Sequence, residues 1–150
     1  MSNLPNPRWY IPAVALMTLL IASLAASLAR GEDSQAETRT VAEVIAAEAG
    51  GEGPQGMTAV ACVIANRARA QHKTPYQIVA AKNQFYGLTA KNRIKLYHQV
   101  KLIADRLARD IMKLKDITDG ALYFRNHKTE PVFKWCKILT FKHNNHWFYR

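Results

Sequence analysis

The chain has 150 residues, which is enough for one domain with a hydrophobic core, and its 49% hydrophobic content excludes a chain that is disordered throughout. Lysine and arginine number 21 against 11 aspartate and glutamate residues, a formal net charge of +10 at pH 7. This excess favours anionic partners: nucleic acid, an anionic membrane surface or an acidic polymer such as a bacterial cell wall. Composition alone ranks nucleic acid first.

The N-terminal part changes that order because residues 9–29 carry no charge. The run is about as long as the roughly 20 residues that a helix needs to cross a bilayer. It is also rich in alanine and serine, and Ser27-Leu28-Ala29 resembles a signal-peptide cleavage site. A signal peptide and an inner-membrane anchor both stay open. Either one predicts export, so that the remaining chain works in the envelope, tethered or released, and does not bind nucleic acid.

The domain organisation follows from a change in composition. Residues 30–39 are polar and show no apolar period, which predicts a linker. We therefore expect three parts: a membrane or signal segment over residues 1–29, a polar linker over 30–39, and one folded domain over 40–150.

The first helix of that domain has a predicted start and end. Thr40 and Glu43 fit a capping box, which predicts a helix that begins at Val41. The pair Gly50-Gly51 predicts its end. Three helices and then three β-leaning pieces should follow, over about 54–70, 74–81, 90–114, 121–124, 133–141 and 146–149.

A basic run lies in the middle of the sequence. No acidic residue occurs between Glu52 and Asp105, and the interval contains many lysines and arginines. Such a run predicts either a solvated basic face or a surface that docks a polyanion. Lys91, Arg93 and Lys95 are at its centre.

One glutamate lies on an apolar helix face. Val41, Val44, Ile45 and Glu48 are spaced i, i+3, i+4 and i+7, which puts Glu48 on the apolar stripe. Partial burial and the negative end of the helix dipole would both raise the pKa of its carboxyl. A carboxylic acid that stays protonated near neutral pH suits the general acid of glycosidic cleavage. The alternative is a glutamate at the rim of the helix whose carboxylate reaches water.

Four blocks of sequence resemble the SleB-type cell-wall hydrolases, the family of the spore-cortex-lytic enzymes. The first block is its opening motif, which reads here Ala47-Glu48-Ala49-Gly50-Gly51-Glu52, then Gly56, Ala59-Val60-Ala61 and Asn66-Arg67. The other blocks follow in the family's order: Gln84-Phe85, Gly120–Asn126 and His146–Tyr149. The chain departs from the family's pattern at the extra residue Gly53, at Met57 after Gly56, and at Asn144-Asn145 before the final histidine.

The resemblance implies an α+β, mostly helical, lysozyme-like (lytic transglycosylase-like) domain that cleaves the MurNAc–GlcNAc bond of peptidoglycan glycan strands. Glu48 corresponds to the catalytic acid. It would protonate the leaving oxygen and then act as base while the C6 hydroxyl of MurNAc closes a 1,6-anhydro ring. This chemistry needs one carboxylate where ordinary glycosidases use two, so Glu52 receives a supporting role. A hydrolase that uses water in place of the C6 hydroxyl stays open.

The other candidate residues should contact the glycan or support the acid. They are Glu52, Asn66, Gln84, Phe85, Tyr123, Asn126 and His146. For Asn66 the alternative is a core asparagine bonded to the backbone, and for Tyr123 it is core packing. We expect no cofactor and no metal, because the histidines have no companion ligands at familiar spacing.

Two settings fit such an enzyme: a phage endolysin of the signal-arrest-release kind, and a bacterial enzyme of cell-wall remodelling. The rival class is a non-catalytic, membrane-anchored cationic module that binds anionic wall polymers, and such a module would not need an acid at Glu48. We expect a monomer. Cys62 and Cys136 either pair in an oxidising compartment, or Cys62 is a buried thiol.

Overall fold

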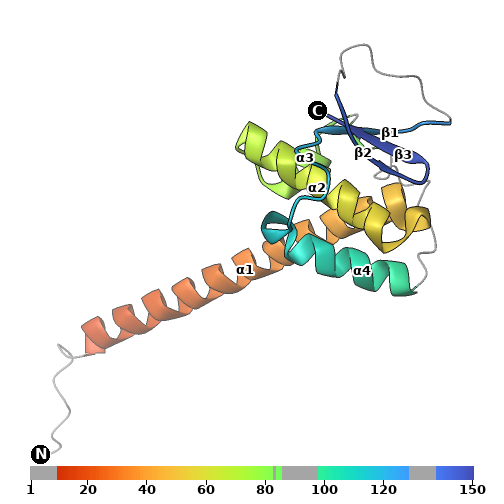
Figure 1. The fold of residues 1–150 in the computed structure, drawn as a ribbon. Coiled ribbons are helices and arrows are strands. Elements are labelled where there is room, and N and C mark those ends of the chain that lie inside the picture. The colour runs from red at the N-terminus through yellow and green to blue at the C-terminus, as the bar shows by residue number, and fades with distance from the viewer. Residues whose placement is uncertain (1–9, 83, 86–97, 129–137) are drawn as a thin grey trace, which may run out of the picture. The chain divides into compact units, whose positions relative to one another are not determined.

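The computed structural model describes residues 10–82, 84–85, 98–128 and 138–150 (Figure 1). The chain divides into two compact units, Met1–Ala36 and Glu37–Arg150. The second unit contains helices and a three-stranded sheet, which agrees with the expected α+β, mostly helical class. The domain boundaries expected from composition stay a prediction.

Helix α1 spans Tyr10–Ala49 without a break. The prediction of a helix that begins at Val41 is therefore wrong, and residues 30–39 are helical. They lack an apolar period, but apart from Gly31 they contain no residue that strongly disfavours a helix, and propensity suffices to carry the helix through them.

The membrane or signal segment expected over residues 1–29 stays a prediction. Within the described ranges, no helix is both long enough and apolar enough to cross a membrane.

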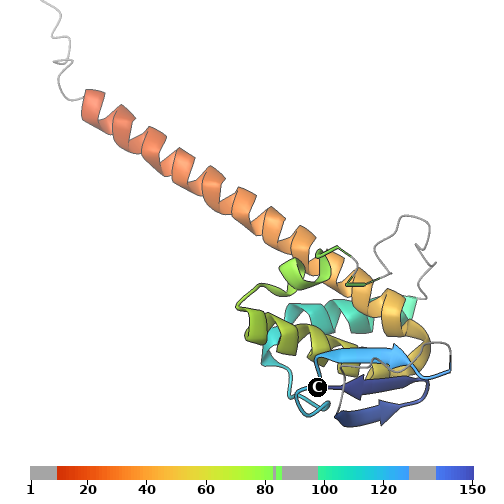
Figure 2. The same cartoon turned by 90° about the horizontal axis from the view of Figure 1, so that it is seen from above.

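Helix α2 (Gly53–Gln71) is the centre of the second unit, as its apolar circumference predicted. Residues 59–65 are all buried, and α2 contacts α3 (Pro75–Val79), α4 (His98–Arg109) and the short 3-10 helices η2 (Gly50–Glu52) and η5 (Ile111–Lys113). Pro54 lies in the first turn of α2, where its missing N–H costs nothing. Figure 2 shows α4 and the sheet with α2 between them.

The helix predictions are confirmed in part. Thr74 caps α3 through a capping box with Gln77, although this helix ends at Val79 and not at residue 81. The long helix predicted over 90–114 is described from His98 and ends at Arg109, and residues 90–97 lie outside the described part.

The sheet has the strand order β1-β3-β2 and is antiparallel throughout. Its strands are β1 (Tyr123–Asn126), β2 (Leu139–His143) and β3 (His146–Tyr149). Phe124 and Phe141 both lie opposite Phe148, and these three rings pack with the core. The third predicted strand is confirmed residue for residue. The first begins two residues later than predicted, and the second is described only from residue 138.

Candidate active site

The last turn of α1 presents Glu48 at the edge of the core. Val44 and Ile45 are fully buried and Val41 is 2% exposed, while Glu48 is half-buried. The i, i+3, i+4, i+7 stripe is thus confirmed. The helix ends one residue later, and η2 turns the chain into α2. The raised pKa expected for the Glu48 carboxyl stays a prediction.

The second glutamate, Glu52, is bonded to the turn between β2 and β3. Its Oε2 accepts a hydrogen bond from the backbone N–H of Asn145, and its Oε1 accepts one from the Asn145 amide, both at 3.3 Å. The Glu52 carbonyl lies 2.9 Å from Nε2 of His143. These contacts fasten the chain that follows Glu48 to the hairpin, and the supporting role expected of Glu52 stays a prediction.

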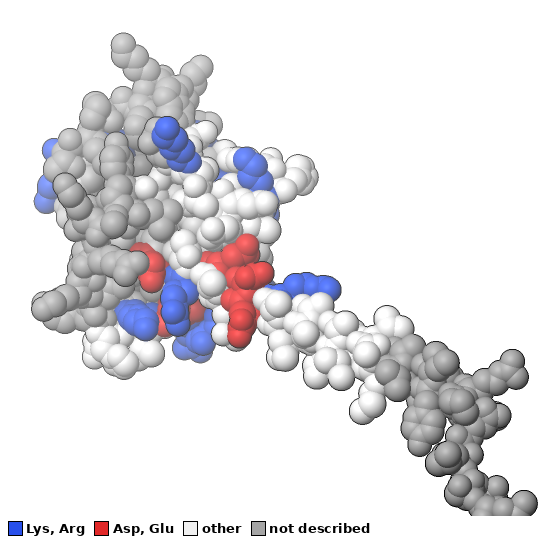
Figure 3. Space-filling view, turned by 180° about the vertical axis from the view of Figure 1, so that it is seen from behind, with Lys and Arg blue, Asp and Glu red and all other residues white. Residues whose placement is uncertain are grey.

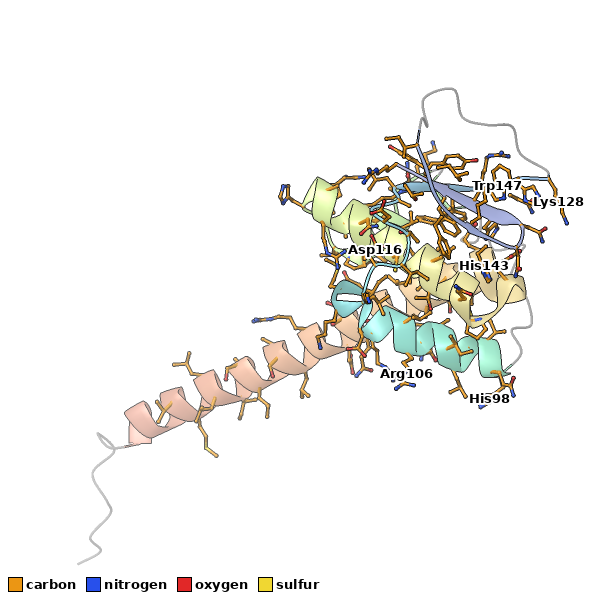
Figure 4. All side chains as sticks on the ribbon, viewed as in Figure 1. His98, Arg106, Asp116, Lys128, His143 and Trp147 are labelled. Atoms are coloured by element: carbon orange, nitrogen blue, oxygen red, sulfur yellow. The ribbon has the colours of Figure 1, made fainter. Side chains whose placement is uncertain are left out.

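Gly56 permits this close approach. A Cβ at Gly56 would overlap the Cβ of Glu52 and would lie 3.1 Å from Cδ2 of His143. Figure 4 shows His143 at the end of the hairpin, close to the start of α2. This chain therefore has a steric reason for a glycine at position 56, since any side chain there would push Glu52 and His143 away from α2.

A row of aromatic rings continues from the hairpin along the helix-facing side of the sheet. The centroids of His146 and Phe124 are 5.3 Å apart, and those of Phe124 and Phe85 are 6.4 Å apart. Asn126 lies opposite His146 in the register of β1 and β3. The structure thus brings three of the expected site residues, Phe85, Asn126 and His146, into one row. Phe85 and His146 are 8% and 7% exposed, so most of their surface contacts protein.

Arg67, which the sequence analysis did not propose as a site residue, contacts three of the proposed site residues. Arg67 donates a hydrogen bond to Oε1 of Gln84, and its guanidinium lies 5.3 Å from the ring centroids of both Phe85 and Tyr123. The sequence indicated Arg67 only as part of the Asn-Arg pair of the family motif and as one residue of the basic run. The sequence feature that could have indicated Arg67 is its charge, which lies among alanines on a mostly apolar helix.

The contacts of Asn66 favour the alternative interpretation, a structural asparagine that is hydrogen-bonded within the protein. Its amide donates to Oδ2 of Asp116 at 3.0 Å and to the carbonyl of Ala121 at 3.1 Å, and its Oδ1 accepts from Arg69. Asn66 therefore fastens α2 to the turn before β1. Its contact with the acid or the sugar stays a prediction.

Asp116, which the sequence did not indicate, organises that turn. Its carboxylate accepts hydrogen bonds from the Thr118 N–H and hydroxyl, from the Gly120 N–H and from Asn66. Burial alone would raise the pKa of the Asp116 carboxyl, but these hydrogen bonds outweigh burial and lower it to about 2.

On the other side of the sheet, Trp147 is surrounded by basic and histidine side chains. Trp147 lies 4.4 Å from Nζ of Lys142, and the imidazole of His127 stacks on its ring with centroids 4.9 Å apart. The Arg125 guanidinium lies 5.4 Å from the same ring. Trp147 therefore links all three strands, because Arg125 and Lys142 are its partners on β1 and β2.

On the described part of the face in Figure 3, lysines and arginines lie in separate groups with acidic residues nearby. Arg67 is buried and contributes nothing to a solvated face, whereas Lys73 and Lys101 are exposed. Lys91, Arg93 and Lys95 lie outside the described residues.

Cys62 is a buried free thiol, and Cys136 lies outside the described part. Among the described residues, no group of three or more histidine, cysteine, aspartate or glutamate side chains is placed to hold a metal ion.

The fold and the sequence of the second unit together define the class of protein. The chain belongs to the cell wall hydrolase family, whose sequence model matches residues 51–149. It is accordingly an enzyme that degrades the cell wall, and its substrate class is peptidoglycan. The matched range includes Glu52 and begins just after Glu48.

Two solved structures share this fold. One is the catalytic domain of the Bacillus cereus SleB protein, with a TM-score of 0.63, 24% identity, and coverage of 76% of this chain and 89% of that domain. The other is the catalytic domain of the germination-specific lytic transglycosylase SleB from Bacillus anthracis, with a TM-score of 0.62, 24% identity, and coverage of 76% and 93%. No curated protein matches the chain in sequence.

Proposed function

We propose that the chain is a peptidoglycan lytic transglycosylase that cleaves the MurNAc–GlcNAc bond with Glu48 as its one catalytic carboxyl group. The observation that carries the proposal is the position of Glu48, half-buried at the end of the apolar stripe and directly before the helix ends. Burial there favours the protonated acid, and the C-terminal end of a helix does the same.

The reaction has two proton transfers. Glu48 first donates its proton to the glycosidic oxygen, and the bond between that oxygen and C1 of MurNAc breaks. The Glu48 carboxylate then takes the proton of the MurNAc C6 hydroxyl, whose oxygen forms a bond to C1 and closes the 1,6-anhydro ring. No water is consumed, and Glu48 ends protonated, as it began.

The contacts of Glu52 support a mechanism with one carboxyl group. Both of its carboxylate oxygens accept hydrogen bonds from Asn145. A second catalytic carboxylate would have to activate water or attack the sugar. We assign Glu52 to holding the hairpin next to Glu48.

The matched variants Glu48→Gln and Glu52→Gln test the proposal. Glutamine keeps the shape of the side chain but cannot donate the proton. General acid–base catalysis is typically worth about 10²–10⁴-fold, so Glu48→Gln should lose nearly all clearing of purified peptidoglycan while it still folds and binds the wall. Glu52→Gln should lose much less. If Glu52→Gln loses lytic activity and Glu48→Gln keeps it, the catalytic acid is Glu52 and not Glu48.

Mass analysis of the released muropeptides separates the two reaction types. A transglycosylase gives 1,6-anhydro products, which are lighter by one water than the products of a hydrolase. If only hydrated products appear, the enzyme is a hydrolase and the ring-closing step is wrong. If both glutamine variants stay fully lytic, the assignment of the catalytic group fails.

We propose further that the enzyme is exported and works as a monomer on the wall, either in phage lysis or in wall remodelling. Gln84, Tyr123 and Asn126 would line the glycan groove, and the mostly buried Phe85 and His146 would support it. The exposed lysines and arginines would attract the anionic wall over long range, so added salt should weaken binding. The rival, a cationic binding module, would bind the wall without releasing muropeptides.

A further inference from the structure

Arg67 is an almost completely buried cation that joins three parts of the chain. It lies in the last turns of α2 and is 9% exposed. Its Nε donates to the carbonyl of Leu122, directly before β1, and its Nη1 donates to Oε1 of Gln84 at 3.1 Å. One side chain thus fixes both the Gln84-Phe85 segment and the entry to the sheet relative to α2.

The guanidinium of Arg67 also contacts two aromatic rings. Its Cζ lies 5.3 Å from the ring centroid of Phe85 and 5.3 Å from that of Tyr123. Both distances are within the range of a cation–π contact. Lysine cannot replace these contacts, because a single ammonium lacks the planar fork that donates in two directions while it stacks on rings.

The neighbours of Arg67 are three of the residues expected to contact the glycan. Gln84 is exposed and Tyr123 is half-buried, so both present surface to a ligand, while buried Phe85 holds the segment in place. Since Arg67 binds the amide oxygen of Gln84, the amide NH₂ is directed away from it as a hydrogen-bond donor. This donor suits the hydroxyl and acetamido oxygens of an amino-sugar chain.

We propose that Arg67 is a positioning residue for glycan binding: it holds Gln84, Phe85 and Tyr123 together as one wall of the groove and thereby sets the affinity for the glycan. The inference rests on the proposed function for the existence of that groove. Arg67 acts through its neighbours and not on the reacting bond, so its loss should change KM and leave kcat nearly unchanged.

Steady-state kinetics of the full chain on solubilised peptidoglycan fragments test this. Misplacing the Gln84 donor would remove about one hydrogen bond to the glycan, which corresponds to about a tenfold change in affinity. Arg67→Lys and Arg67→Met should therefore raise KM about tenfold, with kcat within about twofold. The matched control is Arg109→Lys, which changes an exposed arginine of α4 and should leave both constants unchanged.

A second variant keeps the test valid if the Arg67 variants do not fold. Gln84→Leu removes the acceptor on an exposed side chain and should also raise KM. Combined with Arg67→Lys, its effect should be less than additive, because both changes break the same contact. Additive effects, an unchanged KM in either folded variant, or a loss confined to kcat would overturn the proposal.

A spectroscopic measurement separates this inference from the proposed function. In protein labelled with 3-fluorotyrosine, the ¹⁹F resonance of Tyr123, identified by Tyr123→Phe, should shift in Arg67→Lys and in Gln84→Leu but not in Arg109→Lys. If the parent releases no muropeptides, the proposed function fails. If Tyr123 does not shift, Arg67 does not position this wall, whatever the activity is.

Discussion

Glu52 and Asn145 are 93 positions apart in the sequence, yet two hydrogen bonds of 3.3 Å join the carboxylate of the first to the backbone and side chain of the second. One partner follows the helix that carries Glu48, and the other lies in the turn of the hairpin. The geometry around the proposed acid therefore depends on a contact between the two halves of the domain.

Replacing Asn145 should show what this contact contributes. Asn145→Ala removes one donor to a charged acceptor and should lower the free energy of unfolding by about 1–2 kcal/mol. Asn145→Asp should cost more at pH 7, because two carboxylates then face each other. Urea unfolding of both variants at pH 7 measures this. Equal stability of Asn145→Asp and the parent at pH 7 would contradict the contact.

The glycine beside this contact should not tolerate a side chain. Gly56→Ala would overlap the Cβ of Glu52 and should destabilise the fold by about 1–3 kcal/mol. Gly51→Ala is the matched control, because an added Cβ there meets no atom within 4 Å and should leave stability unchanged or slightly raised. Thermal unfolding of both variants compares them. Equal melting temperatures would show that the neighbours of Gly56 give way at no cost.

The turn at Asp116 should make stability depend on acid pH. The pKa of its carboxyl is about 2 in the folded protein and is lower than the ordinary value of 3.8. The unfolded chain therefore binds the proton more readily, and the stabilisation is complete above about pH 4 and is lost as the pH falls toward 2. Because the group is partly exposed, we discount this stabilisation to about 1 kcal/mol.

Urea midpoints between pH 6 and pH 2 for the parent and Asp116→Asn test this dependence. The difference between them should be largest at pH 6 and should shrink toward pH 2. Asp119→Asn, which changes an exposed aspartate whose partner Arg150 lies 3.8 Å away, is the control and should show no such trend. A constant difference at all pH values would contradict the assignment.

The thiol of Cys62 should react slowly. Burial raises its pKa, the nearby Asp116 carboxylate acts in the same direction, and Sγ lies 3.7 Å from the Lys115 carbonyl. In a Cys136→Ser background, a thiol reagent at pH 8 should modify folded protein far more slowly than protein in urea. Rapid modification of the folded protein would show that Cys62 is accessible.

Local sequence patterns predicted the features that depend on residues close together in the sequence, namely buried helix faces and strands. The spacing of Val41, Val44 and Ile45 located the buried face of α1 and put Glu48 at its edge. His146–Tyr149 was correctly read as a strand from alternation and aromatic content. The predicted start of α1 at Val41 was wrong, because the capping-box pattern at Thr40 carries no information on the helical residues before it.

Contacts between distant segments could not be predicted in this way. The partnership of Glu52 with Asn145 depends on how η2 meets the hairpin, and no local pattern encodes that. The same holds for Asp116, whose turn gathers hydrogen bonds from its own neighbours and from α2. The sequence indicates that Arg67 needs partners, because it is a charged residue on an apolar helix. Only the fold shows that these partners are Leu122 and Gln84.

The strand order β1-β3-β2 sets the sequence in which the sheet can assemble. Because β3 separates the other two strands, β1 has no partner until β3 exists, whereas β2 and β3 can pair as a local hairpin. We expect the hairpin to form early and β1 to join it late, since the β1–β3 pairing closes a longer loop. On the ribosome, the wall built on β1 and the turn that holds Glu52 would both be absent until β3 has emerged. A chain that lacks β3 would therefore have neither the β1 pairing nor the hairpin turn that binds Glu52.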